Sequence, residues 1–107
     1  MIQSFHAHIY YDPQSREVAA EVREAIERQF TVTMGRWHDK PVGPHPQSMY
    51  QVAFEPDQYS ALTQWLMLNR RDLTVLVHPN TGDDIGDHRD YPFWMGRVLP
   101  LDLEKLT

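Results

Sequence analysis

Two histidines in one short stretch are the first residues that indicate chemistry. His6 and His8 lie in the run FHAHIYY, residues 5–11. Successive side chains of an extended strand point to opposite faces, so these two imidazoles project from the same face, about 7 Å apart. Such a pair is either two solvated surface histidines or half of a metal site, because neutral imidazole is a good ligand for iron, zinc, copper and nickel.

The composition of the chain limits the kinds of site and partner that are possible. The chain has 107 residues, six histidines, no cysteine and a net charge of -5. The absence of cysteine excludes disulfides, zinc–thiolate sites and thiol catalysis. The acidic balance argues against nucleic acid and against a membrane surface as partners, since both require a concentrated basic face. We expect a single domain over residues 1–107, without a signal peptide or membrane span, in the cytoplasm.

The hydrophobic pattern predicts four strands and two helices. The strands are expected at residues 5–11, 31–34, 49–54 and 73–78, with amphipathic helices over residues 12–30 and 55–69. This βαββαβ order is typical of an α+β, ferredoxin-like fold, with a four-stranded antiparallel sheet and two helices on one face. We expect the first and third strands to be central and parallel, and the fourth to run antiparallel beside the first.

The faces of the predicted strands separate by polarity. The set expected beneath the helices is uniformly apolar and comprises Phe5, Ala7, Ile9, Tyr50, Val52, Phe54, Leu73, Val75 and Val77. The set expected on the other face is more polar and comprises His6, His8, Gln51, Thr74 and His78. Because one apolar face per strand is what a half-buried sheet requires, the pattern supports the fold and places the histidines on the open face.

Strand direction brings further histidines toward this pair. His78 ends the fourth strand beside the start of the first, and His45 precedes the third strand, so both are expected at the edge that carries His6 and His8. A histidine site without cysteine and with open positions is typical of non-haem iron or catalytic zinc. A carboxylate ligand is left open among three candidates, namely Asp39, Asp87 and Asp90.

Four stretches together resemble a known family. They are FHAHIYY at residues 5–11, GRWHDKPVGPHP at 35–46, LNRRDLTVLVHPNTGDDIGDH at 68–88 and WMG at 94–96. In this order they resemble the DOPA 4,5-dioxygenase family. The resemblance implies a ferredoxin-like homodimer that opens the ring of a catechol, such as L-DOPA or caffeate, with O₂ and Fe(II). Zinc can take the place of iron in purified protein, since no carboxylate ligand is evident beside the histidines.

Roles can be assigned to residues on the same basis. We expect His8 and His78 as metal ligands, with His6 next and His45 close behind. In the resulting assignment His6, His8 and His78 hold the metal, whereas His45 and His88 are catalytic and manage protons. Substrate contacts are expected from Arg70, Arg89 and Trp94. Surface ion pairs explain the two arginines better, and packing of the chain's tail against the sheet explains the tryptophan equally well.

Two other functions are compatible with parts of the pattern. The first is a non-catalytic, dimeric ferredoxin-like protein that binds a metal or a metabolite through its open sheet face. The second is a two-histidine phosphoesterase, which requires Ser or Thr two residues after each histidine. Here those positions hold His8 and Asn80, so the phosphoesterase is disfavoured.

Overall fold

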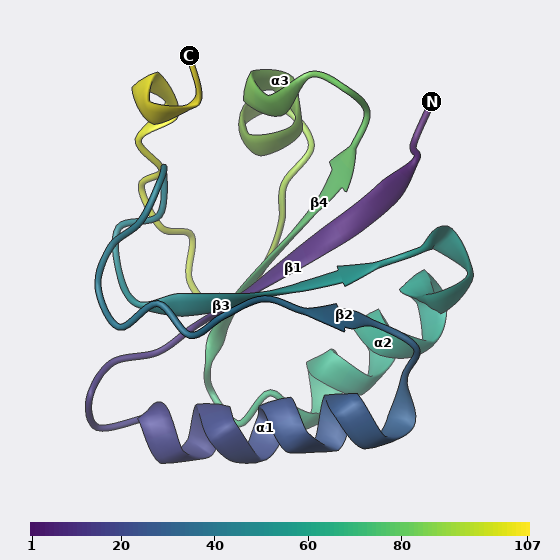
Figure 1. Cartoon of the computed structure of the whole chain (residues 1–107), viewed down its shortest axis with the longest axis vertical. Coiled ribbons are helices and arrows are strands. Elements are labelled where there is room, and N and C mark those ends of the chain that lie inside the picture. Colours follow the sequence, from purple (N-terminus) through teal and green to yellow (C-terminus); the bar gives the residue numbers. More distant parts are fainter.

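The computed structural model describes residues 1–107 and contains five strands and three α-helices (Figure 1). In chain order the elements are β1 (Ser4–Tyr10), α1 (Arg16–Gln29), β2 (Thr33–Met34), β3 (Met49–Phe54), α2 (Pro56–Asn69), β4 (Thr74–Asn80), α3 (Asp84–Arg89), β5 (Phe93–Met95) and the 3₁₀ helix η1 (Leu103–Leu106). The strands form one sheet in the order β2-β3-β1-β4-β5. None of the helices is long and apolar enough to cross a membrane.

The predicted order of elements is confirmed for the first four strands and the two long helices. The predicted number of strands was wrong, because β5 adds a fifth strand beside β4, with Val75 opposite Met95 and Val77 opposite Phe93. The short helix α3 was not predicted either. Both elements are too short to show a hydrophobic period, so the stretch after Pro79 looked irregular in the sequence.

The relative direction of β1 and β3 also differs from the prediction. The two strands are antiparallel, with Phe5 opposite Phe54 and Tyr10 opposite Met49. Each βαβ crossover leaves room for one strand between its two parallel strands. Since β3 fills the gap between β1 and β2 and is antiparallel to β2, it must be antiparallel to β1 as well. The start of β3 therefore lies at the end of β1, away from His6.

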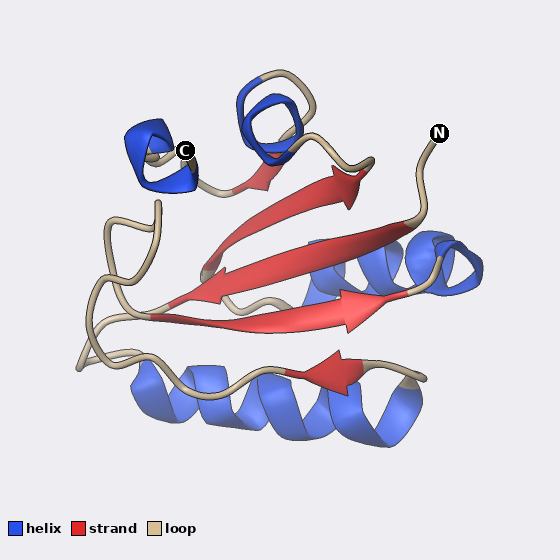
Figure 2. Ribbon diagram, turned by 45° about the horizontal axis from the view of Figure 1, so that its top comes forward, coloured by secondary structure: helices blue, strands red, loops and turns tan.

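The hydrophobic core lies between the sheet and the two long helices. Figure 2 shows α1 and α2 on one side of the sheet, with α3 and the C-terminal segment on the other. The predicted apolar face is confirmed, because all nine of its residues except Phe5 are buried in this core and Phe5 packs against it. From the helices, Ala19, Val22, Ile26, Leu62 and Leu66 close the core.

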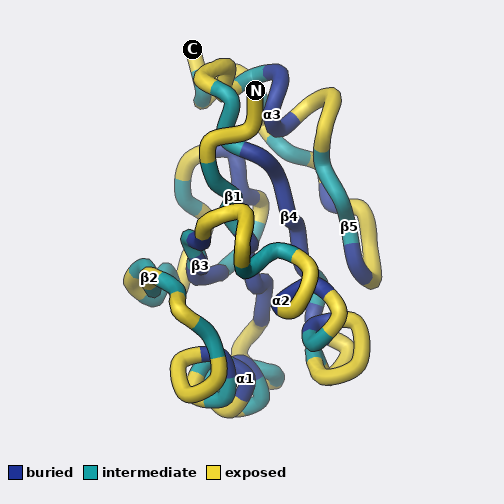
Figure 3. Tube along the Cα trace, turned by 90° about the vertical axis from the view of Figure 1, so that its right-hand side faces the viewer, coloured by how far each residue is buried: buried dark blue, intermediate teal, exposed yellow.

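The opposite face of the sheet is covered as well. Tyr10, Met49, Leu76 and Leu99 form a second, smaller cluster there. The backbone N–H of Asp102 donates to the carbonyl of Pro44 at 2.9 Å, which joins the C-terminal segment to the loop of residues 35–48. In Figure 3 the strands under these segments are largely buried. The face that the sequence left open is thus closed by its own loop, its own tail and α3.

The loop of residues 35–48 is fastened to α1 by charge and aromatic contacts. The guanidinium of Arg16 lies over the ring of Trp37, 4.2 Å from its centroid, and its Nε donates to Asp39 at 2.8 Å. The hydroxyl of Tyr11 donates to the same carboxylate at 2.6 Å. A long loop whose first part is fastened in this way can place one side chain accurately over the sheet.

The second cluster yields a stability prediction. Leu99→Ala should lower the free energy of unfolding by about 2 kcal/mol, because it removes a buried side chain and leaves a cavity over the sheet. Leu68→Ala is the matched control, since Leu68 is 87% exposed and its loss should cost less than about 0.5 kcal/mol. Urea unfolding of both variants measures the difference, and equal midpoints would show that the tail does not cover this face.

Candidate metal centre

Five of the six histidines gather on the covered face of the sheet. They come from four parts of the chain: His6 and His8 from β1, His45 from the loop, His78 from β4 and His88 from α3. The exposed fraction is 3% for His8, 6% for His45, 1% for His78 and 9% for His88, whereas His6 is half-buried. Histidine is seldom buried in such numbers, so the cluster requires a chemical reason.

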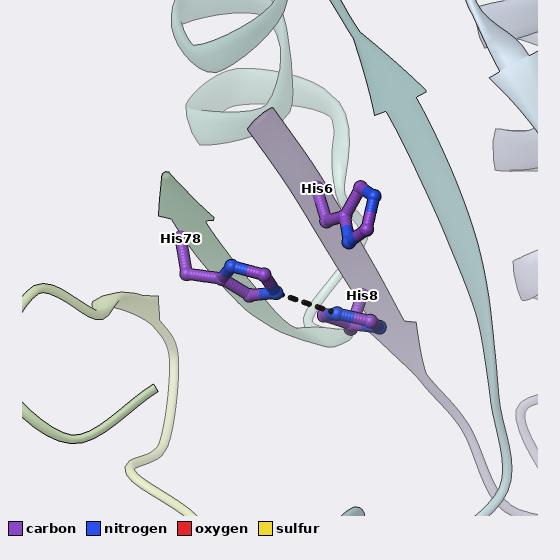
Figure 4. A group of neighbouring side chains, drawn as sticks. All are labelled: His6, His8 and His78. Carbon is purple, nitrogen blue, oxygen red and sulfur yellow. Dashed lines mark hydrogen bonds between the residues drawn. The ribbon is translucent and has the colours of Figure 1, made fainter. Parts of the chain in front are cut away.

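The pairing of β1 with β4 creates the centre of the cluster. His6 lies directly opposite His78, and His8 follows on the same face. Figure 4 shows the Nε2 atoms of His8 and His78 facing each other, 3.1 Å apart. Two nitrogen ligands at right angles around a metal, each about 2.1 Å from it, lie roughly 3.0 Å apart. The two imidazoles therefore already have the spacing of a pair of metal ligands.

His45 and His88 complete a second group around His8. The ring of His45 overlies that of His8, with 4.2 Å between centroids, and the ring of His88 lies 4.0 Å from that of His78. Two groups of three histidines result, and in each all ligand atoms lie within 4.8 Å of one another. The groups are His6, His8 and His78, and His8, His45 and His88.

His45 reaches the cluster by a route that differs from the predicted one. The sequence predicts His45 at the same edge as His78 through a third strand parallel to the first, and that direction is wrong. Instead the loop turns back over the sheet through a tight turn, in which the His45 N–H donates to the Val42 carbonyl at 3.0 Å. Gly43 adopts a φ of 54° in this turn, a conformation that glycine tolerates best.

His88 is positioned by the polar contacts of α3. The carboxylate of Asp83 accepts from the N–H of Gly86 and caps the helix. The carboxylate of Asp87, which is 1% exposed, accepts from the Thr81 backbone N–H at 2.8 Å and from its hydroxyl at 2.6 Å. These bonds hold so short a helix against β4, so His88 projects back toward His78.

The three carboxylates considered as ligands are engaged elsewhere. Asp39 binds Arg16 and Tyr11, Asp87 binds Thr81, and Asp90 forms an exposed ion pair with Arg89. Both groups of candidate ligands accordingly consist of histidines alone. The donor set offered by this chain is three imidazoles.

Burial holds three of the clustered histidines, His8, His45 and His78, in the neutral form. Burial lowers the pKa of His45 and of His78 to about 4, and for the same reason the pKa of His8 is well below its usual value of 6.5. Neighbouring histidines add to the effect, because a second positive charge in the cluster would repel the first. Neutral imidazoles keep a free lone pair, which metal binding requires.

The hydrogen bonds of the rings also fit a metal. The Nδ1–H of His78 donates to the Pro79 carbonyl at 2.9 Å, which leaves the lone pair of Nε2 free to face His8. Metal-binding histidines are commonly oriented by such a bond from the other ring nitrogen. The buried Nδ1 of His8 has no hydrogen-bond partner, so no bond of this kind orients the ring of His8. The residues present therefore fit a divalent metal of the iron or zinc type.

The predicted substrate residues lie in three different settings. Arg70 donates to the Leu73 carbonyl at the start of β4, at the far end of that strand from His78, so the structure does not bring it to the cluster. Arg89 follows His88 but is paired with Asp90 on the surface. Trp94 pairs with Leu76 and therefore shares the face of the histidines.

One polar residue of this face was missed by the sequence reasoning. The hydroxyl of Tyr10 lies 2.6 Å from Nδ1 of His45, and the residue is 1% exposed. The signal was present, because Tyr10 continues the alternation of His6 and His8 on the same strand face. It was overlooked since a tyrosine at a strand end is usually a packing residue.

A comparison of the chain with known families adds to the geometry. Residues 5–105 match the model of the Dopa 4,5-dioxygenase family. The chain belongs to this family. All five clustered histidines lie within the matched residues. The resemblance noted in the sequence is thereby confirmed.

Relatives of the chain include two fungal proteins and one of known structure. A DOPA 4,5-dioxygenase of Amanita muscaria is 31% identical over 98% of this chain, and an uncharacterized 21.2 kDa protein of Botryotinia fuckeliana is 41% identical over 94%. The chain spans 50% and 61% of their lengths. The crystal structure of a candidate dioxygenase from Nostoc punctiforme is 55% identical, with a TM-score of 0.97 over 98% of this chain and 91% of that one.

The neutral histidines make stability depend on pH. In the folded, metal-free protein His45 and His78 stay neutral down to about pH 4, whereas in the unfolded chain they bind protons below about pH 6.5. The unfolded state then binds more protons, so acid should lower the free energy of unfolding by roughly 1–2 kcal/mol for each histidine at pH 5. Urea unfolding at pH 7 and pH 5 measures this. His45→Gln should lose part of the dependence, and identical midpoints at both pH values would contradict it.

Metal binding should depend on the facing pair. His8→Ala and His78→Ala should each abolish stoichiometric binding of Zn²⁺ or Co²⁺, measured by calorimetry and by the visible spectrum of cobalt, because each removes one of the two nitrogens already at ligand spacing. His38→Ala is the control, since His38 lies outside both histidine groups and should leave one metal per chain. Full metal content in both cluster variants would show that the site lies elsewhere.

Proposed function

We propose that this protein is a non-haem, Fe(II)-dependent extradiol dioxygenase that opens the ring of a catechol, such as L-DOPA or caffeate, with O₂. The observation that carries the proposal is the buried cluster of neutral histidines in a member of the Dopa 4,5-dioxygenase family. The name of the Amanita muscaria relative supports the reaction and the substrate. We further propose a homodimer in the cytoplasm.

The metal ligands proposed are His6, His8 and His78. This group contains the pair with facing Nε2 atoms and includes the half-buried His6, which leaves a side of the site within reach of a ligand. When bound there, iron supplies a positive centre with open positions and a one-electron redox couple for the reaction with oxygen. Zinc fits the same nitrogens but lacks the redox couple, so zinc-loaded protein should be inactive.

His88 is the proposed proton acceptor. Its Nδ1–H donates to the Asp84 carbonyl at 2.7 Å, so the lone pair of a neutral His88 is on Nε2. Because a carbonyl can only accept, this tautomer is fixed as long as α3 stays in place. His88 can then take a proton from a catechol hydroxyl as the substrate binds. His45, whose ring overlies that of His8, is the second residue proposed to exchange a proton with the substrate.

The substrate is proposed to approach past His6. The other four clustered histidines are at most 9% exposed, so the half-buried His6 marks the accessible side. Trp94 lies on the same face and offers an aromatic wall against which a catechol ring can pack. Arg89 follows His88 and can meet a substrate carboxylate if it leaves its exposed partner Asp90.

A second function has an observation in its favour. None of the four cavities of the structure is lined by a clustered histidine, and the largest, of about 550 Å³, lies beside Phe5, Tyr59 and Tyr91. A closed cluster suits a non-catalytic metal-binding protein, because such a protein needs no space for an organic substrate. The two functions differ in whether oxygen is consumed.

The deciding experiment loads the protein with Fe(II) without oxygen, then adds air and L-DOPA or caffeate. Ring cleavage should give oxygen uptake and a yellow semialdehyde absorbance. His78→Ala should lose both signals, whereas His38→Ala should keep them, since His38 is outside the cluster. If iron binds in stoichiometric amount yet no catechol drives oxygen uptake, the non-catalytic metal-binding protein is the correct function.

A further inference from the structure

Tyr10 is a buried polar residue of the histidine face to which the proposed reaction assigns no role. Its hydroxyl makes one hydrogen bond, to Nδ1 of His45 at 2.6 Å, and this is also the hydrogen bond that the His45 ring makes with the protein. Each group thus depends on the other for its polar contact. Since both residues are buried, the direction of this bond determines where the His45 proton lies.

The direction of the Tyr10–His45 hydrogen bond follows from the donors and acceptors that each group has available. A phenol is protonated at neutral pH, and its O–H must be donated to an acceptor if it is buried. His45 Nδ1 is the acceptor within reach of Tyr10. If Nδ1–H donated to Tyr10 instead, the phenol proton would have no partner, which typically costs 1–3 kcal/mol. Tyr10 is therefore the donor, and neutral His45 carries its proton on Nε2.

The opposite arrangement is found at the two other anchored histidines. His78 and His88 each donate Nδ1–H to a backbone carbonyl, so their lone pairs are on Nε2. His45 has no such lone pair to offer, because one nitrogen accepts from Tyr10 and the other holds the proton. Of these three anchored histidines, His78 and His88 are acceptors at Nε2 and His45 is a donor, which distinguishes His45 from the proposed ligand His78.

We propose that Tyr10 is a positioning residue that sets His45 as the hydrogen-bond donor of the site, through its Nε2–H, toward the anionic oxygen of a bound catecholate. This inference rests on the proposed function for the identity of the catecholate, but not for the state of His45. A donor held in place in a dry site stabilises an oxyanion far better than water-exposed donors do. It also favours the group of His6, His8 and His78 over the group of His8, His45 and His88 as the metal site, because metal binding by His45 would require its tautomer to change.

The surroundings of Tyr10 prevent the hydroxyl from turning away. Its ring stacks on Trp94, with 6.0 Å between centroids and 23° between planes, and packs in the cluster with Met49, Leu76 and Leu99. His45 is fixed from its own side by the turn that begins at Val42. Both rings are thus held by packing and by the backbone, and Tyr10 makes no hydrogen bond to His6, His8 or His78, so its hydroxyl can be removed while the rings keep their places.

The test uses Tyr10→Phe, which removes the hydroxyl and keeps the ring. Long-range ¹H–¹⁵N spectra of the histidines in metal-free protein should show a pyridine-like Nδ1 and a protonated Nε2 for wild-type His45. In Tyr10→Phe this pattern should be replaced by a mixture of tautomers. Zn²⁺ stoichiometry should be unchanged, whereas catechol affinity of the zinc-loaded protein and kcat/KM of the iron-loaded protein should fall roughly 10- to 100-fold.

Tyr50→Phe is the matched control. Tyr50 is buried and donates one hydrogen bond, to the Ala19 carbonyl at 2.8 Å, but on the opposite face of the sheet. It should lose a similar amount of stability while the His45 signals and the catechol affinity remain those of the wild type.

The outcomes separate this proposal from the proposed function. A wild-type spectrum with the proton on Nδ1 of His45 overturns the assignment, even if Tyr10→Phe fails to fold. Unchanged catechol affinity in a folded Tyr10→Phe overturns the positioning role. If neither protein binds or cleaves a catechol while the spectra show the expected tautomer, the tautomer assignment holds, whereas the donor role toward a catecholate and the dioxygenase function both fall.

Discussion

The pairing of β1 with β4 is the constraint on which the rest of the site depends. The register places His6 opposite His78 and brings the Nε2 atoms of His8 and His78 to 3.1 Å. A shift of β4 by one residue would send His78 to the helix side, away from His6 and His8. The register is fixed from the other face, where Ala7, Val75 and Val77 fill the core beneath α1 and α2. The candidate metal centre is thus held in place by residues on the opposite face of the sheet.

Burial of the histidines lowers the stability of the fold but prepares the rings for metal binding. A buried imidazole without a partner destabilises the fold, as the unpartnered Nδ1 of His8 illustrates. The same burial holds the rings neutral, so no proton has to leave before a metal can bind. The covering loop, α3 and the C-terminal segment therefore contribute to the chemistry without supplying any of the proposed metal ligands. The metal-free protein is expected to be less stable than the metal-bound protein. A bound metal would engage the ring nitrogens that otherwise face one another in the buried cluster.

The sequence predicted those parts of the molecule that follow from the periodic spacing of apolar residues in strands and helices. Alternation along residues 5–11 and 73–78 assigned the strand faces correctly, and antiparallel pairing of these two strands brought His78 to His6 and His8. The features that it missed arise from tertiary structure. Neither the three residues of β5 nor the single turn and a half of α3 has a readable period, and the path of the loop that carries His45 depends on contacts with α1. His45 was placed near His8 through a wrong strand direction, so its position was correct although the reason was not.

The two edges of the sheet have a consequence for assembly. One edge is β2, of two residues, and the other is β5, of three. Long edge strands present rows of free N–H and C=O groups that invite pairing between chains, and short edges are one of the ways in which proteins avoid it. A second copy of this chain therefore finds little backbone on which to extend the sheet. Any homodimer has to form through side-chain surfaces, which makes its strength a matter of shape and apolar area rather than of strand addition.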